Sequence, residues 1–194
     1  MTATIEAAGH ANWVPLPLDT DPDVVVDRLR GRYAATTPED DLALQLDLVR
    51  GTIAALRRQD DSWEETGTAI GAAWALTPDP ERLEIAALAV LRASAVTAAT
   101  GAEAVMSELI GEGPVHGQPV VESLDGAGTG CYRLRYRPIV ENAEEREVHQ
   151  LNAVVWLRPE QSLVYVLSSY VQSLLEADTI GDLLEELALG MAGF

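Results

Sequence analysis

The residue types in this chain best suited to recognition occur together in one short run, CYRLRYR at positions 131–137. Arginine alternates with aromatic and apolar residues along the run, and successive side chains of a β-strand point to opposite faces of a sheet. The run therefore predicts a strand whose two faces differ in chemistry. One face carries Arg133, Arg135 and Arg137, named the Arg strip below, and the other carries Tyr132, Leu134 and Tyr136.

Polar residues of the next two predicted strands extend the face of the Arg strip. Alternation carried through the turns adds Gln150 and Asn152, then Ser168 and Tyr170. Arginine, tyrosine and amide side chains are typical of recognition surfaces. Two interpretations stay open: a surface that meets acidic or carbonyl-rich groups of a partner, or a solvated face whose arginines pair with the protein's own carboxylates. The opposite face is the expected core, with Leu151, Val155, Leu157, Leu163, Tyr165 and Leu167.

The histidines offer little further chemistry. His10, His116 and His149 have no metal-ligand spacing, and a zinc site needs three or four converging ligands. We therefore expect no metal and no cofactor. Glu147 and His149 would share one face of a strand as an acid–base pair, for which ordinary surface or cross-strand pairing is the alternative.

Two other features have plain structural interpretations. Cys131 is the only cysteine, and we expect a packed strand residue that forms no disulfide and reacts slowly with thiol reagents. The Gly-rich segment 126–130 leads into a strand, whereas a phosphate-binding loop opens a helix. It is predicted to be a hairpin loop.

Composition narrows the class of partner. The 194 residues include 31 acidic and 13 basic ones, for a formal net charge of −18, and every basic residue is arginine. Abundant alanine without lysine indicates a GC-rich bacterial genome. The negative charge argues against nucleic acid and against anionic membrane surfaces. Without a basic and apolar leader or an uninterrupted run of 18 apolar residues, the sequence predicts a cytoplasmic protein with no membrane insertion.

Helical signals dominate the first half of the chain. Asp21-Pro22 and Thr37-Pro38 each place a capping residue before a proline, which predicts two helices, the second reaching about Arg58. The WVPLPL segment at 13–18 contains two prolines, which favour an edge strand or a packed arm. Residues 68–76 and 83–95 favour the two strands of a hairpin, although their alanine content leaves helices open. Residues 102–110 are typical of a short helix.

The second half is predicted to be mostly β-structure. Four runs of strand length, at 115–124, 131–140, 148–157 and 163–172, are separated by turn-rich linkers. An amphipathic helix follows from Ala177, with Asp178 or Thr179 as its cap. The sequence thus predicts an α+β fold, an antiparallel meander covered by helices. Residues 1–12 are expected to form a flexible tail and residues 13–194 a single domain.

A family resemblance rests on residues 153–188, AVVWLRPEQSLVYVLSSYVQSLLEADTIGDLLEELA. A strand ending near a tryptophan, a tight turn, a β-rich strand and a capped amphipathic helix follow one another there. In this order the C-terminal third resembles Mog1/PsbP-like domains, whose antiparallel sheet carries helices on its faces. The resemblance implies a binding or assembly factor, as most members of that family are, rather than an enzyme.

The leading hypothesis is therefore a non-enzymatic binding or assembly protein that engages a protein partner, or a second copy of itself, through the polar sheet face or an exposed helix. One alternative is an enzyme that binds a small molecule or an anion in a pocket near the Arg strip, with Arg133, Arg135 and Tyr170 around it. A second alternative is a structural subunit of a homo-oligomer or larger particle, with Trp13 and the WVPLPL arm as a clasp.

Overall fold

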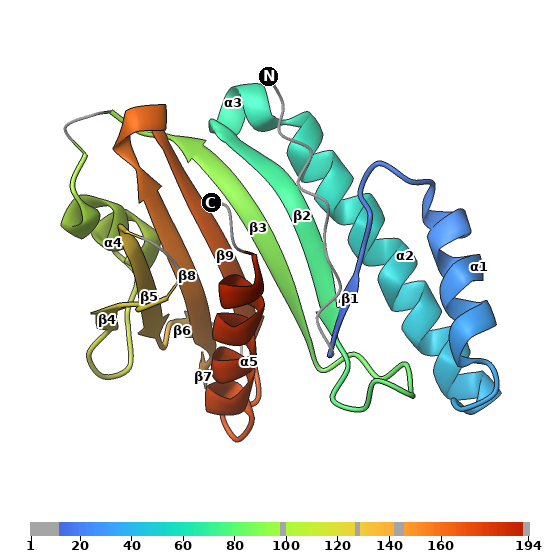
Figure 1. Ribbon diagram of the computed structural model, residues 1–194. Helices are drawn as coiled ribbons and strands as arrows, with labels where there is room; N and C mark the ends of the chain where they lie inside the picture. Colours follow the sequence, from blue (N-terminus) through green and yellow to red (C-terminus); the bar gives the residue numbers. More distant parts are fainter. Residues whose placement is uncertain (1–11, 98–99, 127–128, 142–145, 192–194) are drawn as a thin grey trace. The chain divides into compact units, whose positions relative to one another are not determined.

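The computed structural model describes residues 12–97, 100–126, 129–141 and 146–191 (Figure 1). Its contacts form two compact units, residues 1–92 and 93–194. Residues 1–11 of the tail expected at 1–12 lie outside the described residues. The single domain expected over 13–194 stays a prediction. Among the described helices, none has the length and apolar character needed to span a membrane.

The first unit combines two long helices with three strands. Its elements are β1 (Trp13–Pro15), α1 (Pro22–Tyr33), α2 (Glu39–Asp61), α3 (Trp63–Thr66), β2 (Thr68–Leu76) and β3 (Ala87–Ala95), the last of which ends beyond the unit. The strands follow the order β1-β2-β3, and β1 pairs antiparallel with β2. The segments whose type the sequence left open are therefore strands. The WVPLPL arm supplies the edge strand β1, with Trp13 buried opposite Leu76.

Apolar residues three and four apart give α1 and α2 one buried face each. The two helices contact each other, α2 contacts β2, and both buried faces belong to one apolar cluster with residues of the strands. The buried face of α2 consists of Leu42, Leu46, Val49, Ile53 and Leu56. Asp21 caps α1 as predicted, since its carboxylate accepts a hydrogen bond from the Asp23 N–H at 2.9 Å. Thr37 makes no cap for α2, because its hydroxyl accepts from the buried Leu83 N–H at 3.0 Å.

The second unit holds the predicted meander. Its elements are α4 (Ala102–Ile110), β4 (Val120–Ser123), β5 (Cys131–Tyr136), β6 (Ile139–Glu141), β7 (Arg146–Val148), β8 (Gln150–Arg158), η1 (Pro159–Gln161), β9 (Leu163–Val171) and α5 (Ala177–Gly190). The strand order β9-β8-β5-β4 is antiparallel throughout, while β6 and β7 form a separate pair. The fold class is α+β, as predicted.

Proline and glycine shorten two of the predicted strands. The run at 131–140 divides into β5 and β6 at Pro138, which has no N–H for a ladder. The run at 115–124 reduces to β4, because Gly117 is left-handed (φ 78°) and Pro119 precedes the strand. Val115 keeps only an isolated bridge to Pro138.

A helix covers each face of the second unit's sheet. On one face, Val105 and Met106 of α4 pack with Leu134, which is 0% exposed. On the other face, α5 contacts β8 and β9. The predicted register of β5 is confirmed, since Tyr132, Leu134 and Tyr136 lie on the α4 face and Arg133 and Arg135 lie beneath α5.

The predicted register of β9 is wrong by one residue. The connection of residues 159–162 ends at Ser162 in the left-handed region (φ 55°), and it pairs Arg158 with Leu163. Residues paired across an antiparallel ladder share a face, so a shift by one residue moves every side chain to the opposite face.

Ser168 and Tyr170 therefore change sides. They lie opposite Ala153 and Leu151, on the α4 face, and not beside the Arg strip as predicted. Tyr165 and Leu167, expected in the core with Leu134, lie opposite Trp156 and Val154 on the α5 face. The two faces of β9 carry the reverse of the predicted chemistry.

Candidate functional site

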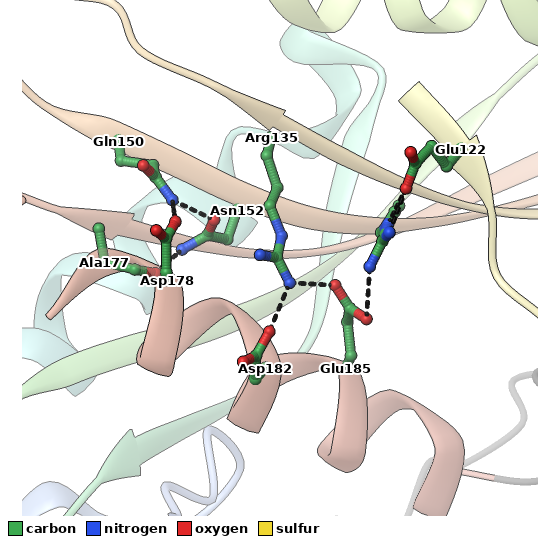
Figure 2. A network of polar contacts seen from close by, with 9 residues as sticks. Glu122, Arg135, Gln150, Asn152, Ala177, Asp178, Asp182 and Glu185 are labelled. Carbon is green, nitrogen blue, oxygen red and sulfur yellow. Dashed lines mark hydrogen bonds and ion pairs between the residues drawn. The ribbon is translucent and has the colours of Figure 1, made fainter. Parts of the chain in front are cut away.

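The Arg strip lies under a helix of its own chain. Arg135 donates from Nη2 to Asp182 Oδ1 at 2.8 Å and to Glu185 Oε1, both on α5 (Figure 2). The side chains of Arg135 and Glu185 are only 19% and 16% exposed. The pair is therefore shielded from solvent, and it is an internal contact of the second unit.

Arg133 connects two elements at once. Its guanidinium donates from Nε to Glu122 Oε2 on β4 at 2.6 Å and from Nη1 to Glu185 Oε2 on α5 at 3.4 Å. Glu122 lies directly opposite Arg133 in the β4–β5 ladder. A chain of charges thus runs from the outermost strand of this sheet through β5 to the helix.

The amide side chains of β8 complete the network at its other end. Gln150 donates to Asn152 Oδ1 at 2.9 Å and to Asp178 Oδ1 at 3.2 Å, and Asn152 donates to the Ala177 carbonyl at 2.9 Å (Figure 2). Arg137, which follows β5, donates to Gln150 Oε1 at 3.1 Å.

These tertiary bonds explain the start of α5. The predicted cap, Asp178 or Thr179, is wrong, because Glu176 takes that position without a side-chain hydrogen bond. Asp178 lies inside the first turn, where its negative charge suits the helix dipole and where its carboxylate receives Gln150.

Charge and close packing both hold α5 on this face. Burial opposes the charge of Arg135 most strongly, but the hydrogen bonds and charges of Asp182 and Glu185 outweigh it, so the pKa of the guanidinium is raised. At Gly181 a Cβ would lie 3.1 Å from the Asn152 side chain and 3.2 Å from Arg135 Cζ. The absent side chain lets the helix approach the polar network closely.

Five of the seven candidate binding residues therefore converge, and two do not. Arg133, Arg135, Arg137, Gln150 and Asn152 form one network with α5, whereas Ser168 and Tyr170 lie on the α4 face. Four carboxylates from the same chain meet the network: Glu122, Asp178, Asp182 and Glu185.

Tyr170 joins a second cluster, with the Glu147 and His149 that the sequence pointed to as a pair. His149 is 6% exposed, and its Nε2 lies 2.8 Å from Glu147 Oε2 while its Nδ1 lies 2.7 Å from the Tyr170 hydroxyl. In the neutral imidazole, Nε2–H donates to the carboxylate and Nδ1 accepts from the hydroxyl. Burial, and next the charge of Glu147, raise the pKa of Tyr170, so its hydroxyl stays protonated at neutral pH. A protonated tyrosine is a hydrogen-bond donor rather than a nucleophile.

Cys131 has the properties of a packed residue. It is buried and makes no disulfide. Burial raises the pKa of its thiol to about 11, partly offset by the positive charge of Arg158. Among the described residues no group of three or more His, Cys, Asp or Glu side chains is placed to hold a metal ion.

The open surface of the second unit lies at an edge that the sequence did not single out. β4 is the last strand in the order β9-β8-β5-β4, and all four of its residues are exposed. Val120 and Val121 are 44% and 43% exposed. The sequence signal for this strand was the pair of adjacent valines after Pro119. Because one long strand was predicted over 115–124, the sequence did not reveal that β4 is short or that it lies at an edge.

Comparison with known proteins gives no match, whether to family models, to curated sequences or to solved structures.

Proposed function

We propose that this protein is a non-enzymatic binding or assembly protein that acts through protein–protein contacts made at the β4 edge. The supporting observation is that all four residues of β4 are exposed at the end of the strand order β9-β8-β5-β4. An exposed edge strand presents unpaired N–H and C=O groups to another chain. Strand addition at such an edge is a recurrent way of recognising a protein segment.

The Arg-bearing face contributes to this function from within the second unit. Arg133 ties Glu122 of β4 to Glu185 of α5, so the edge strand is anchored to the helix through β5. An edge held in one conformation loses less entropy when a partner binds. The Arg strip is thus proposed to support the binding strand rather than to touch the partner.

The family resemblance favours the same class of function. We extend to this chain the binding or assembly role of the Mog1/PsbP-like domains that its C-terminal third resembles. An anion-binding enzyme centred on Arg133 and Arg135 would have to displace the carboxylates of Glu122, Asp182 and Glu185. Because these arginines are already paired with carboxylates, we favour a protein-binding function over an anion-binding enzyme.

Capture of a partner tests the proposal. Tagged wild type is compared with Val121→Lys, which places a charge on the edge, in a lysate of the organism of origin. Val24→Lys is the matched control, because Val24 on α1 is also an exposed valine. We expect a protein that wild type and Val24→Lys retain and that Val121→Lys loses. Equal retention by all three proteins would place the contact elsewhere. If wild type neither retains a specific protein nor associates with itself, the protein-binding function is contradicted.

A further inference from the structure

The second unit contains many more acidic residues than arginines. Residues 93–194 contain fifteen acidic residues and only five arginines. All five arginines bond to groups of their own unit: Arg133 and Arg135 to the carboxylates described above, Arg137 to Gln150, Arg146 to Glu141 and Arg158 to the Thr129 carbonyl. What this unit offers to an approaching chain is therefore an excess of carboxylates.

The register of β4 identifies which backbone groups face outward. The Leu124 N–H donates to the Cys131 carbonyl, so this opposed pair is a hydrogen-bonded one. Hydrogen-bonded and non-hydrogen-bonded pairs alternate in an antiparallel ladder, so the backbone N–H and C=O of Glu122 point toward Arg133 of β5. The N–H and C=O groups of Val121 and Ser123 then point away from the sheet.

Among the described residues, no hydrogen bond satisfies these outward groups of Val121 and Ser123. Pro119 limits the edge on one side, because it has no N–H to offer, and the turn at Asp125 limits it on the other. The open edge is thus short. It offers backbone hydrogen bonds, two exposed valine side chains and the exposed carboxylate of Asp125, whereas the Glu122 carboxylate is already paired with Arg133.

We propose that β4 accepts, as an added β-strand, an extended segment of a partner protein that is rich in lysine or arginine. This inference rests on the proposed function and names the chemistry of the partner. Main-chain bonds to Val121 and Ser123 hold the segment in register. Its aliphatic side chains cover Val120 or Val121, and its basic side chains meet the Asp125 carboxylate and the excess negative charge of the second unit. A second copy of this chain is the poorer occupant, because β4 pairing with itself would bring two strongly acidic units together.

Synthetic peptides test the charge and the strand addition separately. The probe is a short peptide of alternating lysine and valine, and its counterpart replaces each lysine with glutamate. Binding is measured by titration calorimetry and by hydrogen exchange at the Val121 and Ser123 amides of the full chain. We expect the lysine peptide to protect both amides and to bind at least about tenfold more tightly than the glutamate peptide. Its affinity falls as salt screens the charges.

Two matched pairs of reagents refine the test. N-methylation of the peptide residues whose N–H groups face β4 removes their donors and is expected to weaken binding by about tenfold or more. Methylation of the alternate residues has little effect. Asp125→Asn weakens binding of the lysine peptide a few-fold, whereas Asp40→Asn, at an exposed site on α2, leaves it unchanged.

The outcomes separate this inference from the proposed function. Equal binding of the lysine and glutamate peptides, or absence of protection at Val121 and Ser123 with the lysine peptide, overturns the inference. The proposed function is tested separately, by comparing partner capture by wild type and by Val121→Lys. Self-association of wild type that Val121→Lys abolishes would make a second copy the occupant and would also overturn the basic segment.

Discussion

Arg135 shows how burial changes the value of an ion pair. An exposed pair contributes about 0–1 kcal/mol, but removing one partner of a buried pair leaves the other charge unsatisfied. Arg135 is paired with Glu185 beneath α5, and both side chains are largely shielded from water. The loss of the positive charge at 135 would leave Asp182 without its arginine partner and Glu185 with only the longer contact to Arg133, at 3.4 Å.

We therefore expect Arg135→Gln to lower the free energy of unfolding by about 1–3 kcal/mol. The control is Arg146→Gln, because Arg146 and its partner Glu141 are both 63% exposed. That variant should lose no more than about 1 kcal/mol. Urea unfolding followed by circular dichroism measures both. Equal stability of the two variants would mean that the Arg135 network does not hold α5.

Cys131 is expected to react slowly in the native protein. Its pKa of about 11, against a reference value of 9.0, leaves a roughly hundredfold smaller fraction of reactive thiolate at pH 8. A chromogenic disulfide reagent should label the thiol far more slowly in buffer than in denaturing urea, which is the internal control. Rapid stoichiometric labelling of the folded protein would reopen the interpretation of Cys131 as a nucleophile.

The same shift affects stability at high pH. The folded state keeps the thiol protonated, so this contribution is complete below pH 9 and is lost as the pH rises toward about 11. The loss amounts to about 2–3 kcal/mol at most. When the pH rises from 9 to about 11, the free energy of unfolding should fall less in Cys131→Ala than in wild type, as measured by urea unfolding.

At the scale of single elements, the packing of α5 on the sheet requires a glycine as well as an apolar side. Gly181 faces Asn152 and Arg135, and a Cβ would fall within 3.2 Å of both. Asn152 is buried and hydrogen-bonded to Ala177, so it has little freedom to move aside. A larger residue at 181 therefore forces α5 or the side chains of Asn152 and Arg135 to shift.

Gly181→Leu is therefore expected to destabilise the protein by about 1–3 kcal/mol, although leucine is the better helix former. Gly31→Ala on α1 is the matched control, because a Cβ there would meet no described atom within 4 Å. It should stabilise by about 0.5–1 kcal/mol. Thermal unfolding of both variants distinguishes the two effects, and a stabilising Gly181→Leu would contradict the close approach of α5.

At the scale of the whole molecule, the dominant property is the formal net charge of −18. Repulsion among like charges destabilises a compact chain, and salt screens it over roughly 10 Å at 0.1 M. We expect the melting temperature to rise by a few degrees from low salt to about 0.5 M NaCl. Arg135→Gln should show the same trend, because the effect comes from the net charge. A melting temperature that falls with salt would mean that attractive pairs outweigh the repulsion.

Much of the fold was determined by local sequence. Asp21-Pro22 begins α1, strict alternation set the two faces of β5, and apolar spacing predicted α2 and α5. Each signal acts within a few residues, through capping, pleat or helical period, so it can be read without knowing the rest of the chain. The strands at 68–76 and 87–95, which alanine content left open, were decided by pairing and burial instead.

Tertiary structure decided what the candidate residues do. The connection at 159–162 set the register that placed Tyr170 beside His149, and no residue of β9 itself reveals that choice. The docking of α5 turned the Arg strip from a possible binding surface into an internal network, because Gly181, Asp182 and Glu185 fit its shape and charge. The exposed edge at β4 likewise exists only because no other described strand pairs with it. Alternation can assign a side chain to a face, but only the packing of distant segments determines which face stays open to a partner.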